Sequence, residues 1–344
     1  MILDVFNFEL IIFFTLSTIV YFYIYLNRIK IGNKLKTNDI PDHKRKIHKE
    51  ITPRTGAYSL AIILLLILIY NLIEGFLDKD FNLIIVVSLF AFIIGLVDDA
   101  KELNALKKII LLTIISFIAI FLSENLTITK IYLKTFDTFF YFNQFSIFFT
   151  LLCILLLTNA MNLVDGINGI AISLFFIFFL YTSKIYQIKD VTFISFFIIF
   201  NLIIIFYHNY HGKHFLGDAG TLMLSTLLSL IIIKSNNHII ENPSYKYSAE
   251  HIFIIFIIPG LDMLRLFVKR SLLKKNPFSA DKNHLHHYLI NRFGLKSSLI
   301  LYILIVNIPI LLSYFNIFEQ SHIILFTIAT FFVAIKYLKT TSNT

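Results

Sequence analysis

Charge is scarce in this chain: only 15% of its 344 residues are charged, whereas 57% are hydrophobic and the mean hydropathy is +0.79. That balance lies far outside the range of soluble globular domains and is typical of an integral membrane protein. The chain also lacks the linkers rich in proline, glycine or serine, and the low-complexity tracts, that would divide it. We therefore expect a single domain over residues 1–344.

Cysteine is almost absent as well. The one cysteine, Cys153, lies inside an apolar run, which excludes an intrachain disulfide and argues against a thiol nucleophile or a Cys-rich metal site. The first ten residues, MILDVFNFEL, lack the basic stretch of a cleavable signal. The first apolar run is therefore expected to be a permanent membrane span.

What is abundant is apolar sequence in runs of membrane-spanning length, about 20 residues or somewhat fewer within a bundle. Eleven such runs are found, at 8–27, 57–77, 81–97, 106–123, 144–161, 169–183, 191–207, 219–234, 250–269, 298–314 and 321–338. The expected fold is all-α, a polytopic integral membrane helix bundle with about 11 transmembrane helices.

Lysine and arginine predict the orientation of the bundle, because cytoplasmic loops carry an excess of both. One face would receive the loops at 28–56, 98–108, 162–168, 208–218 and 265–297, together with the C-terminal tail. With Lys336 at the end of the last run counted in the tail, these segments hold 23 of the 30 lysines and arginines. We expect the N-terminus outside and the C-terminus in the cytoplasm. The net charge of +9 then reflects this rule and contact with anionic lipid, so no nucleic-acid partner is expected.

The aspartates divide along the same line. Those expected on the cytoplasmic side lie in short patterned segments and are Asp39, Asp42, Asp98, Asp99, Asp165, Asp218, Asp262 and Asp281. Those expected outside are scattered and are Asp4, Asp78, Asp80, Asp137 and Asp190. A transporter or a lipid-linked sugar flippase, the main alternative function, would need ionisable groups near the bilayer midplane or an internal repeat. Neither is found, with Glu74 the main charge inside a span.

Two short acidic motifs stand at the ends of expected spans. In GLVDDAKEL (95–103), Asp98 and Asp99 form an adjacent carboxylate pair, which is either a solvated helix end or a pair offset by a cation. In HFLGDAGTL (214–222), glycines 217 and 220 flank Asp218 just before a span. Asp218 can cap that helix, and the same corner can bind a metal and a phosphate. The two interpretations are compatible.

The stretch NAMNLVDGINGI (159–170) places Asn162, Asp165 and Asn168 beside glycines 166 and 169. Amide and carboxylate oxygens are ligands for hard cations such as Mg²⁺, amides also read nucleobase edges, and glycine lets the backbone approach a ligand. The spacing does not match a calcium loop. A plain polar turn between helices is the weaker interpretation, because the polar residues are so dense.

Two basic segments complete the expected cytoplasmic face. Residues 38–56 contain Lys44, Arg45, Lys46, His48 and Arg54, and residues 262–289 end in His284, His286 and His287. Such loops often only obey the positive-inside rule, and no cysteine or suitably spaced ligand supports a zinc site at the histidines. Together with the carboxylates, however, these cations suit a diphosphate.

Six segments in this order resemble the polyprenyl-phosphate N-acetylhexosamine-1-phosphate transferases of glycosyltransferase family 4, with the phospho-MurNAc-pentapeptide translocase as a more distant relative. The segments are PDHKRKIH, PRTG, GLVDD, NAMNLVDGING, FLGDAGT and NPFSADKNHLHH, from about residue 40 to 290. The resemblance implies a bacterial enzyme of the cytoplasmic membrane that transfers a sugar 1-phosphate from a UDP-sugar to a polyprenyl phosphate lipid such as undecaprenyl phosphate, releasing UMP. It implies Mg²⁺ as the cofactor, with Mn²⁺ as the alternative ion, and a role in starting a cell-surface polysaccharide. A homodimer is left open.

The resemblance also assigns roles at the acceptor and the metal. Asp98 and Asp99 would act at the acceptor phosphate, with Asp98 as the base or, alternatively, the nucleophile. Asp218 would be the principal Mg²⁺ ligand, with Asn162 nearby.

Substrate binding is assigned to a larger set by the same resemblance. Asp165 and Asn168 would lie beside the nucleotide; the remaining members are Lys46, His48, Lys108, Asn209, Arg270, His284, His286 and His287. Lys46, His48 and Lys108 would neutralise phosphate, while Arg270 and the histidines would contact the diphosphate and the sugar. The HLHH pattern resembles the branch that uses N-acetylglucosamine or a related N-acetylhexosamine.

Three positions depart from the family pattern. Ala57 and Thr221 replace a glycine and a serine and are conservative changes. Asn168 stands where an aspartate is usual, so we expect it to hydrogen-bond the uracil or ribose rather than a metal.

Overall fold

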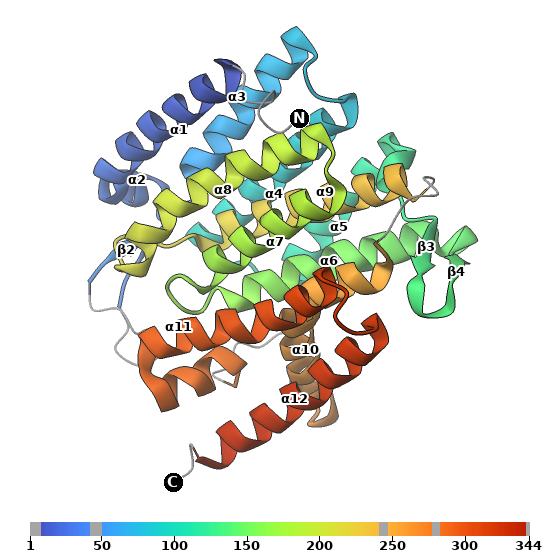
Figure 1. Ribbon diagram of the computed structural model, residues 1–344. Helices are drawn as coiled ribbons and strands as arrows, with labels where there is room; N and C mark the ends of the chain where they lie inside the picture. The colour runs from blue at the N-terminus through green and yellow to red at the C-terminus, as the bar shows by residue number, and fades with distance from the viewer. Residues whose placement is uncertain (1–7, 42–49, 241–246, 277–282, 342–344) are drawn as a thin grey trace.

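The computed structural model describes residues 8–41, 50–240, 247–276 and 283–341. Its α-helices are α1 (Phe8–Leu26), α2 (Arg28–Leu35), α3 (Tyr58–Glu74), α4 (Lys79–Lys101), α5 (Ala105–Leu122), α6 (Ser146–Val164), α7 (Ile170–Tyr186), α8 (Lys189–Tyr210), α9 (Gly217–Ile239), α10 (Ala249–Leu272), α11 (Leu285–Tyr314) and α12 (Gln320–Thr341). Short 3₁₀ turns flank the strands at Glu124–Leu126, Lys134–Phe136 and Asn143–Phe145. The predicted helix bundle is confirmed (Figure 1).

Each predicted apolar run coincides with one of these helices. Eight helices of the described residues are long and apolar enough to cross a membrane, or up to nine if α1 and α2 count as one bent span. The helices α3 and α7 are shorter, with 17 residues each. The count of eleven crossings and the orientation therefore stay predictions.

Helices extend beyond the apolar runs into segments that we expected to be loops. The helix α2 lies in the basic stretch after α1 and bends from it by 72°. At the other end of the chain, α10 continues to Leu272 and α11 already begins at Leu285, with a kink at Gly294. Hydropathy registers only the membrane-facing part of a helix, so charged helical extensions escape it.

Two small antiparallel hairpins lie at opposite ends of the bundle (Figure 1). The first pairs β1 (Asn38–Asp39) with β2 (Thr52–Pro53), with Asn38 opposite Pro53. The second pairs β3 (Lys130–Leu133) with β4 (Thr138–Tyr141), with Lys130 opposite Tyr141. The described parts of the motif segments lie at the β1–β2 end, so this end carries the candidate site.

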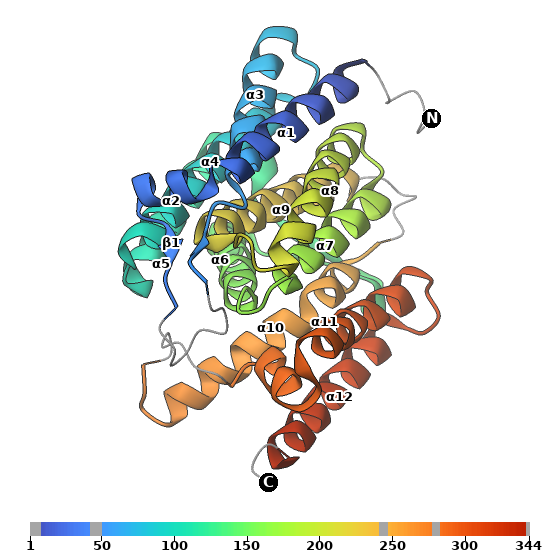
Figure 2. The ribbon, with the colours of Figure 1, turned by 90° about the vertical axis from the view of Figure 1, so that its left-hand side faces the viewer.

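The helix α9 is the centre of the bundle and is buried along most of its length (Figure 2). Its serines donate hydrogen bonds to carbonyls one turn earlier, as Ser225 does to Thr221 (2.5 Å) and Ser229 to Ser225 (2.7 Å). Such small hydroxyl residues satisfy their own polar groups and let neighbouring helices approach closely. The helix α4 packs along α9 on one side and α6 on another.

The end of α9 remote from the site is held by charge. The Lys234 ammonium lies 3.2 Å from a carboxylate oxygen of Asp78 and 3.2 Å from one of Asp80. Asp80 also accepts hydrogen bonds from Ser123 and Asn125, at 2.8 Å each. These contacts tie α9 to the start of α4 and to the connection after α5.

The last three helices, α10, α11 and α12, pack on one another as a group along one side of the bundle (Figure 2). The helix α10 also contacts α6, and α11 contacts α7, which joins this group to the rest of the protein.

Candidate functional site

The site is built where the last turn of α4 meets the first turn of α9. Gly95 permits this contact, because a Cβ atom on it would lie 2.3 Å from the Asp218 carbonyl oxygen and 2.5 Å from the Ala219 backbone nitrogen. One turn beyond Gly95, α4 ends in Asp98 and Asp99. The two acidic motifs that are 120 residues apart in the chain are therefore adjacent in space.

Asp99 connects three segments. Its oxygens accept hydrogen bonds from the backbone N–H groups of Asp218 (3.1 Å) and Ala219 (3.0 Å), so it caps the N-terminus of α9. The Arg54 guanidinium lies 3.3 Å away and also binds Asp39 (2.8 Å). The Asp99 side chain is fully buried. Through these contacts Asp99 holds the last turn of α4 against the start of α9 and against Arg54. The carboxylate on the open side of the site is that of Asp218, not that of Asp99.

Asp98 and Asp218 share one cation. The Lys108 ammonium contacts Asp98 Oδ2 and lies 2.5 Å from Asp218 Oδ2. The other Asp98 oxygen accepts the Leu103 backbone N–H (2.6 Å). The Asp98 side chain is 9% exposed and the Asp218 side chain 29% exposed, so Asp218 is the more accessible of the two carboxylates. In the sequence Asp98 stands beside Asp99, whereas in the structure Asp98 shares Lys108 with Asp218.

Asn162 supports Asp218 from the last turn of α6. Its Nδ2 donates to Asp218 Oδ2 (3.3 Å), and its Oδ1 accepts the Thr221 hydroxyl (3.0 Å). The amide oxygen of Asn162 that we expect near the metal thus accepts a hydrogen bond from Thr221, and its role at a metal stays a prediction. In this arrangement Asn162 orients the Asp218 carboxylate.

The connection between α6 and α7 brings the rest of NAMNLVDGING to the same end. The Gly169 N–H donates to Asn209 Oδ1 (2.7 Å), and Asn209 Nδ2 donates to the His214 carbonyl (3.0 Å). Asn209 is buried. It therefore joins the α6–α7 and α8–α9 connections, and Asn168 lies on the α6–α7 connection beside Gly212.

Asp165 is the ionisable group of this connection. Desolvation by the surrounding protein, followed by the negative charges of Asp218 and Asp99, raises the pKa of Asp165 to about 7. The Asp165 carboxyl is therefore readily protonated when no further positive charge lies nearby. Its ionised form favours binding of a cation near Asp218.

Stability should therefore fall as the Asp165 carboxyl ionises. Because its pKa is raised in the folded state, Asp165 contributes to folding stability fully below the ordinary value of 3.8. This contribution is lost as pH rises through about 7. In EDTA, we expect the thermal midpoint of the wild-type protein to fall more between pH 5 and pH 8 than that of Asp165→Asn. Calorimetry in detergent measures both, and an equal fall in the two proteins would contradict the assignment.

The three histidines take different positions at the start of α11. His284 Nδ1 lies 3.0 Å from Asp262 Oδ2, and the His284 and His286 rings stack with centroids 5.4 Å apart. A Cβ on Gly166 would lie 2.7 Å from His286 Nε2, so His286 contacts the α6–α7 connection. Both ring nitrogens of His286 are buried and have no hydrogen-bond partner among the described residues. His287 follows with its ring centroid 4.4 Å from that of His286.

Of the remaining predicted site residues, some are described by the structure and others are not. Arg270 is buried near the end of α10. Lys46 and His48 lie outside the described residues. Their roles stay predictions.

Three residues of the site were not among the predicted site residues: Arg54, Asp39 and Asp262. Asp262 had a readable signal, because a carboxylate inside the apolar stretch of α10 marks a functional position by default. Arg54 and Asp39 had a weaker signal, since both lie in a basic loop that the positive-inside rule already explains.

The donor set can hold a hard cation only with help from a ligand. Among the described residues, no three His, Cys, Asp or Glu side chains are grouped closely enough to bind a metal alone. Mg²⁺ is commonly held by one or two carboxylates together with substrate phosphates and water. Asp218 and Asp98 fit that role, because both are already oriented toward one positive charge, that of Lys108.

The model of glycosyl transferase family 4 matches residues 81–236. This part of the chain is similar to glycosyl transferase family 4. It runs from α4 to α9 and contains the site residues Asp98, Lys108, Asn162, Asp165 and Asp218, while the histidine motif lies beyond it.

Curated relatives match within a shorter length. The decaprenyl-phosphate N-acetylglucosaminephosphotransferase of Mycolicibacterium smegmatis is 30% identical over 88 residues, covering 23% of this chain and 21% of the relative. The undecaprenyl-phosphate alpha-N-acetylglucosaminyl 1-phosphate transferase of Escherichia coli (strain K12) is 28% identical over 112 residues, covering 33% of this chain and 29% of the relative. The chain thus matches about a quarter of the length of these relatives.

Proposed function

We propose that this protein transfers an N-acetylhexosamine 1-phosphate group from a UDP-sugar to undecaprenyl phosphate and releases UMP, as the first step of a cell-surface polysaccharide. The donor proposed is UDP-N-acetylglucosamine or a related amino sugar. One observation carries the proposal: Asp98, Lys108 and Asp218 meet at one end of an apolar helix bundle, inside the segment that is similar to family 4. The names of both relatives include a polyprenyl phosphate and N-acetylglucosamine.

The reaction must bring two anions together. A diphosphate and a phosphomonoester repel each other, and the transferred phosphoryl group carries spread negative charge in the transition state. Catalysis of this kind depends on positioning and on preorganised positive charge. A bound Mg²⁺ would neutralise phosphate oxygens beside Asp218 and Asp98.

The protein's own groups have separable tasks in this scheme. Asp98 is the proposed base and keeps the acceptor phosphate ionised, while Lys108 supplies a positive charge within reach of Asp98 and Asp218. Asp99 and Arg54 hold the start of α9 in place, and the Asp99 carboxylate is itself the anion that the backbone N–H groups there bind. His286 lies beside Gly166, and its ring nitrogens have no hydrogen-bond partner within the described part of the chain. It is the proposed contact to the donor on the α6–α7 side.

Membrane location follows from the acceptor. A polyprenyl chain stays in hydrocarbon while its phosphate reaches the interface, so a site at one end of an apolar bundle suits both parts of the lipid. The proposed location is the bacterial cytoplasmic membrane, with the site facing the cytoplasm and Mg²⁺, or Mn²⁺ in its place, supplied there.

A radiolabel assay tests the function. Membranes that contain the protein, undecaprenyl phosphate, Mg²⁺ and UDP-[¹⁴C]GlcNAc should form a butanol-extractable lipid, and EDTA should stop its formation. Parallel reactions with UDP-GalNAc and UDP-QuiNAc identify the sugar. Absence of a labelled lipid with every donor, in membranes where the protein is folded, would refute a transferase and favour a transport role.

A further inference from the structure

Asp262 is a buried carboxylate of α10 that binds the start of the next helix. Its side chain is 1% exposed. Its two oxygens accept the backbone N–H of Leu285, at 3.2 and 3.1 Å, and Oδ2 lies 3.0 Å from Nδ1 of His284, the N-cap of α11. One carboxylate thus holds the cap and the first residue of a helix that begins 23 positions later in the chain.

Arg265, one turn beyond Asp262 on α10, holds the same place. Its Nη2 donates to Asp262 Oδ1 (2.8 Å) and to the Asn283 carbonyl (2.5 Å). The Asn283 side-chain oxygen in turn accepts the Tyr288 hydroxyl (3.1 Å). We call Asp262 and Arg265 the α10 clamp. The clamp binds the chain both just before and just after the point where α11 begins.

The clamp also fixes how His284 forms hydrogen bonds. A carboxylate that pairs with Arg265 and binds a backbone N–H only accepts hydrogen bonds, so His284 must donate from Nδ1. Carboxylates commonly fix the tautomer and the orientation of a functional histidine in this way. Nε2 is then the ring nitrogen through which His284 can bind a ligand.

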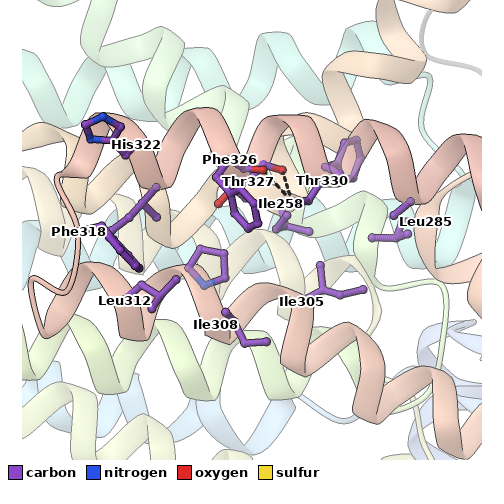
Figure 3. Close-up of a pocket in the computed structure, with 14 residues that line it drawn as sticks. Ile258, Leu285, Ile305, Ile308, Leu312, Phe318, His322, Phe326, Thr327 and Thr330 are labelled. Carbon is purple, nitrogen blue, oxygen red and sulfur yellow. Dashed lines mark hydrogen bonds between the residues drawn. The ribbon is translucent and has the colours of Figure 1, made fainter.

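The apolar side of the same turn is packed less tightly. The Leu285 side chain lines a cavity of about 530 Å³ between α10, α11 and α12, together with Ile258 and Ile305 (Figure 3). A side chain that borders a cavity lacks contact atoms on that side, so its packing holds the backbone less firmly. The position of the first turn of α11 therefore depends on the polar contacts of the clamp.

The position of this turn determines where His286 lies. The His286 ring is parallel to that of His284 within 2°, with centroids 5.4 Å apart, and it lies against Gly166 of the α6–α7 connection. Both ring nitrogens of His286 are buried, and among the described residues no hydrogen bond holds them. The place of the ring beside Gly166 is therefore set by the backbone that the clamp binds.

We propose that Asp262 and Arg265 are positioning residues for the sugar-nucleotide donor, which they affect through His284 and His286. The inference rests on the proposed function, in which these histidines contact the donor, and adds the groups of α10 that set this contact. The diphosphate and sugar of the donor offer the acceptor oxygens and hydroxyls that imidazole nitrogens bind.

Loss of the clamp should weaken donor binding alone. Asp98 and Lys108, which are assigned to the acceptor and the chemistry, lie on α4 and α5. In Asp262→Asn an amide nitrogen replaces one accepting oxygen, so KM for the UDP-sugar should rise about tenfold, the effect of one buried hydrogen bond. The KM for undecaprenyl phosphate and kcat should stay unchanged. Calorimetric titration with UDP-GlcNAc should show the same tenfold loss without turnover.

A second variant covers the possibility that a lone charge prevents folding. The Arg265 side chain is 12% exposed, and removing Asp262 alone leaves its guanidinium without that carboxylate. The double variant Asp262→Asn/Arg265→Gln removes both charges and should raise the donor KM to a similar extent.

Glu250→Gln is the matched control. Glu250 is buried at the other end of α10 and accepts the backbone N–H groups of Lys134 (3.2 Å) and Thr135 (3.0 Å), so glutamine removes the same charge from the same helix. It should lower the thermal midpoint and change neither KM. If the clamp variants lower the midpoint and also change neither KM, the clamp only stabilises the fold and the proposal is overturned.

A spectroscopic readout separates this inference from the proposed function. In nanodiscs, the protein labelled with ¹⁵N-histidine should give a protonated Nδ1 signal that His284→Gln removes and Asp262→Asn shifts. A wild-type protein that forms the labelled lipid but lacks this signal would refute the clamp and leave the transferase standing. A wild-type protein that gives the signal but neither binds UDP-GlcNAc nor forms any labelled lipid would refute the transferase, and the donor role of the histidines with it.

Discussion

Turnover should fall by about 10²–10⁴-fold in Asp98→Asn, the range expected for loss of a general base. Asparagine is nearly isosteric, and its Oδ1 can still accept the Leu103 N–H that Asp98 accepts at 2.6 Å. What it loses is the negative charge that pairs with Lys108. Binding of the UDP-sugar should persist, because Asp98 is assigned to the acceptor. Lipid-product formation and calorimetric titration with a UDP-sugar measure the two properties.

The matched control is Glu102→Gln, which makes the same change in charge four residues later at an exposed position. It should keep full activity. If Asp98→Asn instead abolishes donor binding as well, Asp98 belongs to the donor site. Incubating the wild-type protein with labelled donor and no acceptor tests the route: direct attack by the lipid phosphate leaves the protein unlabelled, whereas a stable phosphosugar-protein adduct would establish Asp98 or another residue as a nucleophile.

The second large effect is expected at Gly217, where α9 begins. Gly217 has φ of +71°, and a Cβ there would lie 2.6 Å from Asp99 Oδ2 and 3.1 Å from the Arg54 Cβ. Alanine must therefore adopt a strained conformation, which costs about 1–3 kcal/mol, and must push Asp99 from the α9 N-terminus. We expect Gly217→Ala to lower the thermal midpoint and to reduce activity by about 10²-fold, because a shift of about 1 Å in a catalytic group has that effect.

Gly260→Ala provides the comparison. Gly260 lies inside α10, and a Cβ on it would meet no atom within 4 Å among the described residues. Alanine there should leave activity unchanged and stability equal or slightly higher, since alanine favours helix over glycine. If Gly217→Ala unfolds no earlier than Gly260→Ala and retains activity, the contact between Gly217 and Asp99 does not position the site.

The helix bundle could be predicted because apolar runs of this length are typical of membrane-spanning helices. The position of each run coincides with a helix. It also predicted which motifs gather at one end, since alternating spans place every second connection on the same side. It could not predict contact partners. Asp99 looks equivalent to Asp98 in the sequence, yet only the approach of α4 to α9 at Gly95 shows that Asp99 caps a helix while Asp98 pairs with Asp218.

Side-chain orientation escaped prediction for the same reason. The Asn162 oxygen accepts the Thr221 hydroxyl, a contact between residues 59 positions apart that the sequence does not reveal. The place of Asn162 near a metal stays a prediction. The helices α2 and the start of α11 were missed because their sequences are charged, and a hydropathy pattern contains no information on polar helices.

The charges at the two ends of α9 have a mechanical consequence. Asp99 binds the first turn, and Lys234, which pairs with Asp78 and Asp80, holds the helix near its other end. Because α9 is held near both ends, it cannot slide along its axis without breaking polar contacts at one end. Its position along that axis is therefore fixed. Changes in bilayer thickness should then be absorbed by tilting of the outer helices, and the spacing between Asp98 and Asp218 should be the same in thin and in thick membranes.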